Sequence, residues 1–351
     1  MDRWPYLYNQ WYATCWASDL GTDLLERSLL DESIVIYRTR AGNPVGLSNR
    51  CAHHHFPLSK GRIIDDRVEC GYHGFTFDCT GVCTRIPGQV RIPEKVRVRS
   101  YPVVERWKWI WVWMGDPSLA DESKIPNFYW LDHPDWEAVG DSLELNARHK
   151  FLNENLLDLT HVEFVHRGSI GAQDLSEFPI ETSVRDGKVF VSRTMNSIEA
   201  PPLFVKTMGL SNRIDRWQVE EFQPPCYHIV HVTAGEVGSS PDESCQYKVL
   251  NAVVPEKNNR TKYLWAVCRN YRRDEKWISD YLREAVQSVF MEDVMICEEQ
   301  ERVLATLNSS QEEMLVRMDA GITRARRILL KMKEEEAVTR AVIPISESTH
   351  A

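Results

Sequence analysis

Two short segments of this chain carry cysteine and histidine at spacings that leave few alternatives for the fold around them. Cys51 and His53 form a C-x-H pair, and Cys70 and His73 form a C-x-x-H pair after sixteen intervening residues. Thiolates and neutral imidazoles are ligands for metal ions, and the glycines beside the second pair allow backbone amides to approach bound sulfur closely. The sequence therefore predicts two loops that together hold one metal centre.

A zinc site of two cysteines and two histidines competes with an iron–sulfur cluster for this pattern. Finger-type zinc sites use closer paired spacings and a helix that carries both histidines. Here each loop supplies one thiolate and one imidazole, so each loop can span two metal ions. This arrangement favours a cluster of two irons and two sulfides, in which two cysteines hold one iron and two histidines hold the other.

The two segments, together with residues 74–81 (GFTFDCTG), resemble the two loops of Rieske iron–sulfur proteins. The resemblance implies a Rieske-type [2Fe-2S] cluster. In oxygenases of this kind an arginine commonly follows the first histidine ligand, whereas this chain has His54 and then His55 at that place. The C-x-H spacing selects the histidine before them, and these two remain weaker competitors or surface groups near the cluster. The implied cluster ligands are Cys51, His53, Cys70 and His73.

Residues 1–117 are expected to form an all-β domain around these loops, because strand and turn signals alternate along the segment. Near its end, tryptophan occupies every second position from Trp107 to Trp113. A period of two places all four indoles on one face of a strand. We expect that face to be a packed core face rather than an aromatic platform for a ligand.

The rest of the chain is expected to form a connector, a second domain and a tail. Residues 118–142 are polar, show no sustained period and are interpreted as the connector. The second domain is expected over residues 143–337, with a helix that starts near residues 319–321. Residues 338–351 are expected to form a mobile tail.

The composition limits the choice of partners and compartment. The 351 residues suffice for two domains that each bury a core, and 42 basic against 51 acidic side chains, without a long basic run, argue against nucleic acid. The first residues lack a secretory signal pattern, and no run approaches the roughly 18–20 apolar residues of a membrane span. Nine cysteines without a framework pattern favour reduced thiols. We therefore expect a cytoplasmic protein that does not enter a membrane.

A helix is predicted between residues 151 and 168, at the start of the second domain. Asn155, Asp158 and His161 recur at intervals of three and share one face of that helix. His166 lies five residues after His161, which is about 140° round an ideal helix. The two imidazoles can therefore reach one ion only if the helix ends or distorts between them. A glycine two residues later is typical of such an end. The pattern favours a metal site, and the alternative is a partly exposed helix with two unrelated histidines.

A longer helix is predicted from Ser279 to about Leu304, and it can supply a third ligand. Asp293 stands in its apolar seam where a leucine would be expected, and a buried carboxylate is costly unless it is paired. Its neighbour Glu292 lies about 100° away, nearer the polar face. Two histidines and one carboxylate form the iron site whose open positions face substrate and dioxygen. The seam residues are Leu282, Val286, Val289, Asp293 and Ile296.

The pattern N-x-x-D-x-x-H-x-x-x-x-H, followed much later by an aspartate, resembles the catalytic domain of Rieske non-haem iron oxygenases. The resemblance implies that Asp158 bridges one histidine ligand of a mononuclear iron to a histidine ligand of a Rieske cluster, and that Asn155 belongs to the catalytic site. In this family that cluster belongs to the neighbouring subunit of a head-to-tail homotrimer, so electron transfer between subunits is implied. The implied iron ligands are His161, His166 and Asp293.

Four further stretches resemble one branch of this family, the vanillate O-demethylase oxygenase subunits with their dicamba and toluenesulfonate monooxygenase relatives. This branch implies a monooxygenase component that hydroxylates a methyl or methoxy group of an aromatic acid, with formaldehyde released from a methoxy group. No nicotinamide- or flavin-binding segment is evident, so a partner is required. The resemblance implies a reductase with flavin and a ferredoxin-type [2Fe-2S] cluster that consumes NADH. The four stretches are 200–202 (APP), 215–218 (DRWQ), 268–271 (CRNY) and 319–321 (DAG).

Two kinds of alternative stay open. An aromatic ring dihydroxylase, or a Rieske hydroxylase of a non-aromatic substrate, would use the same two metal centres. A Rieske electron carrier that catalyses nothing would account for residues 51–73, but it would leave the two histidines and the aspartate of the second domain without a role.

The fold class is expected to be α+β, with the all-β domain followed by a helix-grip-like catalytic domain. Residues 180–270 read as antiparallel strands, and a sheet that wraps the helix carrying Asp293 would leave a pocket over the metal. His231 and Asn251 could point into that pocket and hydrogen-bond a substrate carboxylate or phenol. Each could instead be a polar group of the core or surface, because its facing depends on strand register.

Overall fold

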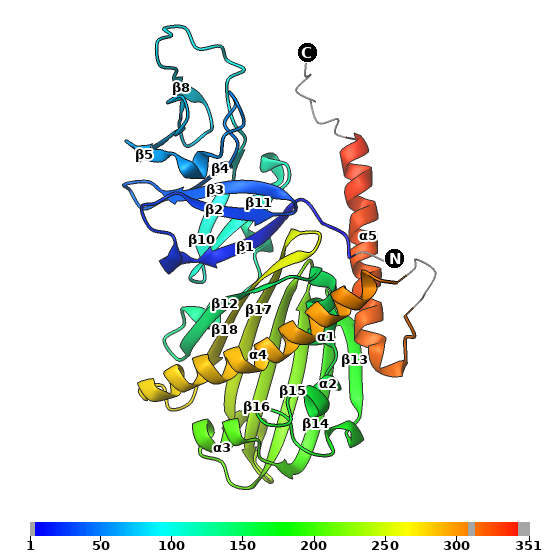
Figure 1. Cartoon of the computed structure of the whole chain (residues 1–351). Coiled ribbons are helices and arrows are strands. Elements are labelled where there is room, and N and C mark those ends of the chain that lie inside the picture. The colour runs from blue at the N-terminus through cyan, green and yellow to red at the C-terminus, as the bar shows by residue number, and fades with distance from the viewer. Residues whose placement is uncertain (1–3, 308–312, 343–351) are drawn as a thin grey trace.

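The computed structural model describes residues 4–307 and 313–342, and its two parts differ in secondary structure (Figure 1). The N-terminal part is all-β, as predicted, with antiparallel sheets of strand order β1-β11-β10, β2-β3-β4-β9 and β5-β6-β7-β8. Its strands are β1 (Gln10–Trp16), β2 (Leu25–Leu29), β3 (Glu32–Arg38), β4 (Pro44–Ser48), β5 (Arg62–Ile64), β6 (Arg67–Glu69), β7 (Thr76–Phe77), β8 (Cys83–Arg85), β9 (Ser100–Tyr101), β10 (Val103–Arg106) and β11 (Trp109–Met114). Two short 3₁₀ helices accompany them, η1 (Ala17–Asp19) and η2 (Leu58–Lys60).

The tryptophan row lies mostly, but not wholly, in one strand. Trp109, Trp111 and Trp113 occupy alternate positions of β11 and are fully buried, as expected for a core face. Trp107 differs from the prediction because it lies with Lys108 in the two-residue turn between β10 and β11. Both turn residues have positive φ, 53° and 57°. That pair of conformations matches the twist of a tight hairpin, so the turn takes the fourth indole out of the strand.

The C-terminal part is a seven-stranded antiparallel sheet with the long helix α4 across one face (Figure 1). The predicted α+β class with a helix on a sheet is thereby confirmed. The strand order is β12-β18-β17-β16-β15-β14-β13. The strands are β12 (Glu137–Leu145), β13 (Ile180–Arg185), β14 (Lys188–Glu199), β15 (Arg213–Gln223), β16 (Tyr227–Glu236), β17 (Cys245–Lys257) and β18 (Arg260–Arg269). The helices are α1 (His149–Leu157), α2 (His161–Val165), α3 (Pro202–Met208), α4 (Lys276–Leu304) and α5 (Ala320–Val342), with short 3₁₀ turns η6 (Leu175–Glu177), η7 (Pro241–Glu243) and η8 (Arg317–Asp319).

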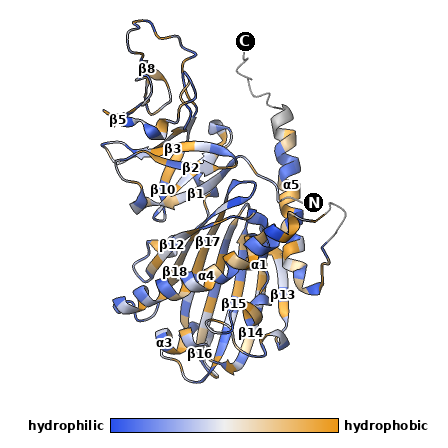
Figure 2. Ribbon diagram, in the orientation of Figure 1, coloured by the Kyte–Doolittle hydropathy of each residue, from blue (hydrophilic) through white to orange (hydrophobic). Residues whose placement is uncertain are grey.

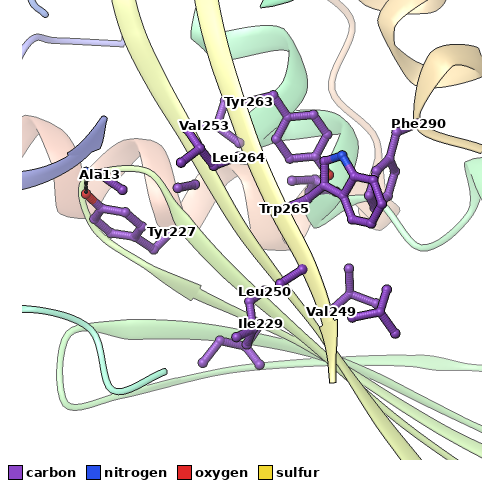
Figure 3. Packing of buried hydrophobic residues seen from close by; sticks show 14 of the residues in the cluster. Ala13, Tyr227, Ile229, Val249, Leu250, Val253, Tyr263, Leu264, Trp265 and Phe290 are labelled. Atoms are coloured by element: carbon purple, nitrogen blue, oxygen red, sulfur yellow. Dashed lines mark hydrogen bonds between the residues drawn. The ribbon is translucent and has the colours of Figure 1, made fainter. Parts of the chain in front are cut away.

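Helix α4 packs its apolar seam against the sheet, as its period predicted. The Phe290 ring centroid lies 5.1 Å from that of Tyr263 and 5.4 Å from that of Trp265, both on β18 (Figure 3). Four of the five seam residues are buried, and Ile296 is half-buried. Hydrophobic and hydrophilic residues alternate along the helix in Figure 2. The buried position of Asp293 is thus a consequence of where the seam lies.

The other face of the sheet joins the N-terminal part through shared core packing. The Tyr227 hydroxyl on β16 donates a hydrogen bond to the Trp11 carbonyl at 2.7 Å and accepts one from the Ala13 backbone N–H at 3.3 Å (Figure 3). Its ring lies 5.4 Å from that of Trp111. Buried residues of both parts belong to one apolar cluster, so the two parts share a core.

The boundaries of the connector and the tail differ from those predicted. Residues 137–142 belong to β12, whose polar residues hid the strand period, and the connector itself contains η3 (Pro117–Leu119), η4 (Glu122–Lys124) and η5 (Tyr129–Leu131). Helix α5 begins at Ala320, next to the predicted start, and continues through residues 338–342 of the expected tail. Residues 343–351 lie outside the described residues. Within the described part of the chain, no helix is both long and apolar enough to cross a bilayer.

Candidate metal centres

The helix predicted between residues 151 and 168 is two helices with a break between them. Helix α1 ends just before Asp158, whose carboxylate accepts a hydrogen bond from the Thr160 backbone N–H at 2.7 Å. An aspartate that bonds the backbone two residues later competes with helical bonding, which explains the break. Helix α2 ends at Val165, and His166 follows in a non-helical conformation. The distortion that the two histidines required is therefore present.

The break and the end of α2 bring His161 and His166 to Asp293 on α4. One ligand atom from each of the three residues lies within 4.8 Å of the others. The Asp293 Oδ1 atom is 3.2 Å from His166 Nε2 and 3.6 Å from His161 Nε2. The Asp293 and His166 side chains are 3% and 2% exposed, and His161 is 17% exposed. The set has the ligand types of a two-histidine, one-carboxylate metal site.

Each imidazole is held at its other ring nitrogen. His161 Nδ1 contacts the backbone carbonyl oxygen of Asp158, while the carboxylate of Asp158 bonds Thr160 instead. His166 Nδ1 lies 2.6 Å from the Glu292 carboxylate. Both Nδ1 atoms face acceptors, so both Nε2 atoms are left to bind at the centre of the site.

Asn155 completes the polar surroundings of Asp293. Its Nδ2 atom donates a hydrogen bond to Asp293 Oδ1 at 3.1 Å. Its Oδ1 atom is buried, and no hydrogen-bond partner for it lies among the described residues. A buried acceptor without a partner is costly, and it fits a site that receives a cation or a water molecule bound to one. These donors therefore fit the predicted mononuclear metal.

Electrostatics differ between the two imidazoles. Burial lowers the pKa of His161 and outweighs the opposing effect of Asp293, so the neutral form that binds a metal is favoured. Burial also opposes charge on His166, but its contacts with Asp293 and Glu292 together prevail and raise its pKa. A cation bound at Nε2 would take the place of a proton there and pair with Asp293, while Glu292 would keep the proton on Nδ1.

The second candidate centre lies on the loops around β5–β8. Cys51 and Cys70 are buried, whereas His53 and His73 are exposed, with ring centroids 4.7 Å apart. Burial is the main cause that raises the pKa of the Cys51 thiol to about 11, so a bound metal is needed to stabilise its thiolate. Two thiols facing inward and two imidazoles facing outward fit a cluster with one iron near the surface.

The two loops have matching backbones. The Cys51 carbonyl accepts a hydrogen bond from the His55 N–H, and the Cys70 carbonyl accepts one from the Gly74 N–H, both at 3.0 Å. His55 and Gly74 both have positive φ, 58° and 71°. Gly71 brings the loops together, because a Cβ there would lie 2.6 Å from the Lys60 carbonyl oxygen. The glycine beside the second pair is therefore required by close approach.

The two extra histidines lie at the surface beside the cluster loops. The His54 ring centroid is 3.9 Å from that of His53 and 5.6 Å from that of His73. His55 is exposed and occupies the left-handed position of its loop. His54 therefore packs on the predicted ligands, and the choice of His53 as ligand continues to rest on the C-x-H spacing.

The structure does not bring His231 to the three-residue site, in contrast to the sequence expectation. His231 is three positions after His228 in β16, so the two side chains leave opposite faces of the sheet. His228 faces α1, where its Nε2 atom lies 2.9 Å from Asn153 Oδ1. His231 faces the connector, where its ring lies 5.9 Å from that of Trp130 and its Nε2 atom lies 3.0 Å from Glu221.

Asn251 lies on the α4 face but is held within the core. It is fully buried and pairs across the sheet with Trp265, which packs on α4. Its Oδ1 atom accepts a hydrogen bond from the Tyr263 hydroxyl at 2.7 Å, and its Nδ2 atom donates to the Val249 carbonyl at 3.3 Å. Both ends of the amide are thus bonded within the protein. The expected contact of Asn251 with substrate stays a prediction.

Glu292 is the contact that sequence reasoning missed. The helical period placed it nearer the polar face of α4, and its side chain is indeed 41% exposed. Its carboxylate nevertheless reaches His166 across the edge of the helix. The only signal was its position next to Asp293, which puts both carboxylates on the same turn.

Comparisons with known proteins cover nearly the whole chain. A model of the vanillate O-demethylase oxygenase C-terminal domain matches residues 145–335, and a model of the Rieske [2Fe-2S] domain matches residues 10–102. The vanillate O-demethylase oxygenase subunit of Pseudomonas sp. (strain HR199 / DSM 7063) is 33% identical over 97% of this chain and 99% of its own length. The toluene-4-sulfonate monooxygenase system iron-sulfur subunit of Comamonas testosteroni is 30% identical over 94% of this chain and 98% of its own.

A solved structure supports the same comparison. The crystal structure of dicamba monooxygenase bound to 3,6-dichlorosalicylic acid superposes with a TM-score of 0.91 at 28% sequence identity. The match covers 95% of this chain and 99% of the other. A further structure of dicamba monooxygenase, described as containing non-heme iron and dicamba, has a TM-score of 0.84 at 26% identity.

Proposed function

Because the chain belongs to the Rieske oxygenases that carry a vanillate O-demethylase oxygenase C-terminal domain, we propose that it hydroxylates a methyl or methoxy group of an aromatic acid. Membership makes it a Rieske non-haem iron oxygenase, an oxidoreductase component whose cofactors are a [2Fe-2S] cluster and a mononuclear iron. The substrate class rests on the relatives, whose names give vanillate, dicamba and toluene-4-sulfonate, three aromatic acids.

The observation that carries the proposal is the convergence of His161, His166 and Asp293. We assign these three residues as the iron ligands. Iron held by them would supply dioxygen activation, in which two electrons from a reductase and two protons are consumed, one oxygen atom is inserted into a C–H bond and the other is released as water. For a methoxy group the hydroxylated carbon then leaves as formaldehyde, and a phenol remains.

The side chains around the ligands set the geometry for this chemistry. Asn155 orients the Asp293 carboxylate by a hydrogen bond to its Oδ1 atom at 3.1 Å. The Asp158 backbone orients the His161 ring. Three protein ligands leave further positions around the iron, as the two-histidine, one-carboxylate site requires for substrate and dioxygen.

Electrons are proposed to reach the iron from another copy of the chain. In Figure 1 the loops around β5–β8, which carry the cluster ligands, lie at the top of the molecule, and helix α2 lies well below them beside the large sheet. This separation supports a homotrimer in which the cluster of one subunit serves the iron of the next, with Asp158 as the bridge between histidine ligands of the two centres. A heterologous, head-to-tail interface closes such a ring.

A separate reductase is proposed to supply the electrons. The relatives are named as subunits or components of multi-component systems, which supports such a partner. We propose that it carries flavin and a ferredoxin-type [2Fe-2S] cluster and oxidises NADH. We also propose a cytoplasmic location, as expected from the sequence.

The decisive experiment is a product assay with a substrate panel. The iron-loaded protein is incubated with a reductase, NADH and methoxylated or methylated aromatic acids, and formaldehyde and hydroxylated products are measured. We expect formaldehyde in stoichiometric amounts with the phenol from at least one methoxylated acid. The Asp293→Ala variant is the control, because it should keep the cluster but lose mononuclear iron and all product.

Two other results would change the assignment. A cis-diol in place of formaldehyde would identify a ring dihydroxylase. Iron analysis that finds only cluster iron, in the wild-type chain as well as in Asp293→Ala, would favour an electron carrier.

A further inference from the structure

His166 is held between two consecutive carboxylates of helix α4. Its Nε2 atom lies 3.2 Å from Asp293 Oδ1, and its Nδ1 atom lies 2.6 Å from Glu292 Oε2. We propose that Glu292 is a positioning residue for the mononuclear metal, because it fixes the tautomer and the orientation of His166. This proposal rests on the assignment of His166 and Asp293 as metal ligands.

The tautomer follows from the acceptor chemistry of a carboxylate. An ionised carboxylate can only accept a hydrogen bond, so the proton of a neutral His166 must reside on Nδ1. The lone pair is then on Nε2, the atom that faces Asp293 and the centre of the site. Without Glu292 the neutral ring could place its proton on Nε2 instead, and that form cannot bind a metal ion at this atom.

The two histidines are supported by acceptors of different strength. His161 Nδ1 contacts a neutral backbone carbonyl, that of Asp158, whereas His166 Nδ1 contacts a carboxylate. Hydrogen bonds to a charged acceptor are roughly twice as strong as those to a neutral one, and a carboxylate makes the imidazole a more basic ligand. Glu292 therefore makes His166 the more strongly held ligand of the pair.

Glu292 lies outside the hydrophobic core, so a substitution there can test the positioning role without disturbing core packing. Its side chain is 41% exposed, whereas Asp293 beside it is 3% exposed. The apolar seam of α4 does not include Glu292, so a substitution there leaves no cavity. The metal-free protein should therefore tolerate the change.

The test measures metal affinity rather than turnover. Mononuclear iron is removed with the cluster retained, and the protein is titrated anaerobically with Co²⁺, whose visible absorption reports coordination. We expect Glu292→Ala to bind Co²⁺ about 10–100-fold more weakly than the wild type. Glu292→Gln should recover part of the loss, because the amide oxygen still accepts from Nδ1.

The matched control is Glu299→Gln on the same helix. Glu299 is exposed and pairs with Arg302, away from the ligands, so its variant should bind Co²⁺ as the wild type does. The thermal midpoint of metal-free Glu299→Gln should agree with that of the wild type within about 2 °C. The midpoint of metal-free Glu292→Ala should fall slightly, because His166 Nδ1 loses its acceptor, and Glu292→Gln should restore it.

Two outcomes would overturn the positioning role. The first is that the Glu292→Ala variant binds Co²⁺ with the same affinity and the same absorption spectrum as the wild type. The second is weaker binding that is matched by a lower midpoint of the metal-free protein and is not recovered in Glu292→Gln, since that would indicate general structural support. Failure of the wild type itself to bind Co²⁺ would overturn the ligand assignment, and with it both proposals, and is distinct from the first two results.

Discussion

At the scale of single residues, Asp158 serves the fold and the proposed electron path through different atoms. Its backbone oxygen holds His161, and its carboxylate stops α1 by bonding Thr160. The residue is half-buried, so it is partly open to solvent, as contact with a neighbouring subunit would require. The two roles can be separated by a substitution that keeps the hydrogen bond and removes the charge.

We expect Asp158→Asn to keep both metal centres and lose reductase-driven turnover by about 10–100-fold or more. The asparagine oxygen can still accept from the Thr160 N–H, so the break before α2 should persist. Iron and sulfide content, together with NADH-dependent product formation, would be measured. Turnover at the wild-type rate would rule out Asp158 as the bridge.

His149 gives a prediction for pH dependence. Its ring is buried beside Trp4 and Tyr6, and burial lowers its pKa from 6.5 to about 4. Between these pH values the unfolded chain binds more protons than the folded one, so stability rises with pH there. The free energy of unfolding is therefore highest above about pH 6.5. It falls by about 3 kcal/mol as the pH drops toward 4, because each pKa unit corresponds to about 1.4 kcal/mol.

We therefore expect His149→Phe to flatten the acid side of the stability profile. Urea unfolding at pH 7 and pH 5 would be compared for the variant and the wild type. The wild type should lose more stability than the variant over this interval. An equal loss in both proteins would show that His149 does not contribute to acid sensitivity.

At the scale of elements, sequence periodicity predicted the long helix and its anomaly well. The seam of α4 is so regular that Asp293 stood out as a buried carboxylate, and the structure buries it against two histidines. Sequence periodicity does not show where a side chain or a tight turn interrupts a helix or strand. The break at Asp158 depends on one side chain bonding Thr160, and the displacement of Trp107 depends on a two-residue turn.

The face of a sheet to which a side chain points is likewise set by strand pairing, which a single sequence does not reveal. His231 and Asn251 lie in neighbouring strands, yet one faces the connector and the other faces α4. A shift of one residue in register would exchange these faces. Glu292 was missed for a related reason, since a helical wheel gives the direction of a side chain but not the reach of a long one.

The cluster loops offer a test at this scale. We expect Gly71→Ala to reduce cluster content, because its Cβ would lie 2.6 Å from the Lys60 carbonyl oxygen and would force the loops apart, at a cost of about 1–3 kcal/mol. Cluster absorbance and mononuclear iron content would both be measured, and the latter should stay unchanged. Gly21→Ala is the control, because a Cβ at that position would have no atom within 4 Å beyond its own chain neighbours.

At the scale of the whole molecule, the two domains share buried contacts, and we expect these contacts to couple their stabilities. We expect Tyr227→Phe to lower the free energy of unfolding by about 1–3 kcal/mol, since it leaves the buried Trp11 carbonyl without its hydrogen bond. The urea midpoints of cluster absorbance and of mononuclear iron release should both fall.

The control for that variant is Tyr101→Phe. The Tyr101 hydroxyl bonds Glu32 within the N-terminal domain, so its loss should lower the midpoint of the cluster signal more than that of iron release. If Tyr227→Phe lowered only the midpoint of the cluster signal, the contact across the domains would not couple their stabilities.

The two metal centres also differ in how far apart their donors lie along the chain, and this bears on how the protein is made. The cluster donors fall between Cys51 and His73, whereas Asp293 follows His161 by 132 positions, with β13–β18 between them. Synthesis proceeds from the N-terminus, and domains generally fold as they emerge. The cluster loops can thus be complete while the large sheet is still being translated. The proposed mononuclear site can form only when α4 packs on the finished sheet, so we expect iron loading there to be a late step of biogenesis.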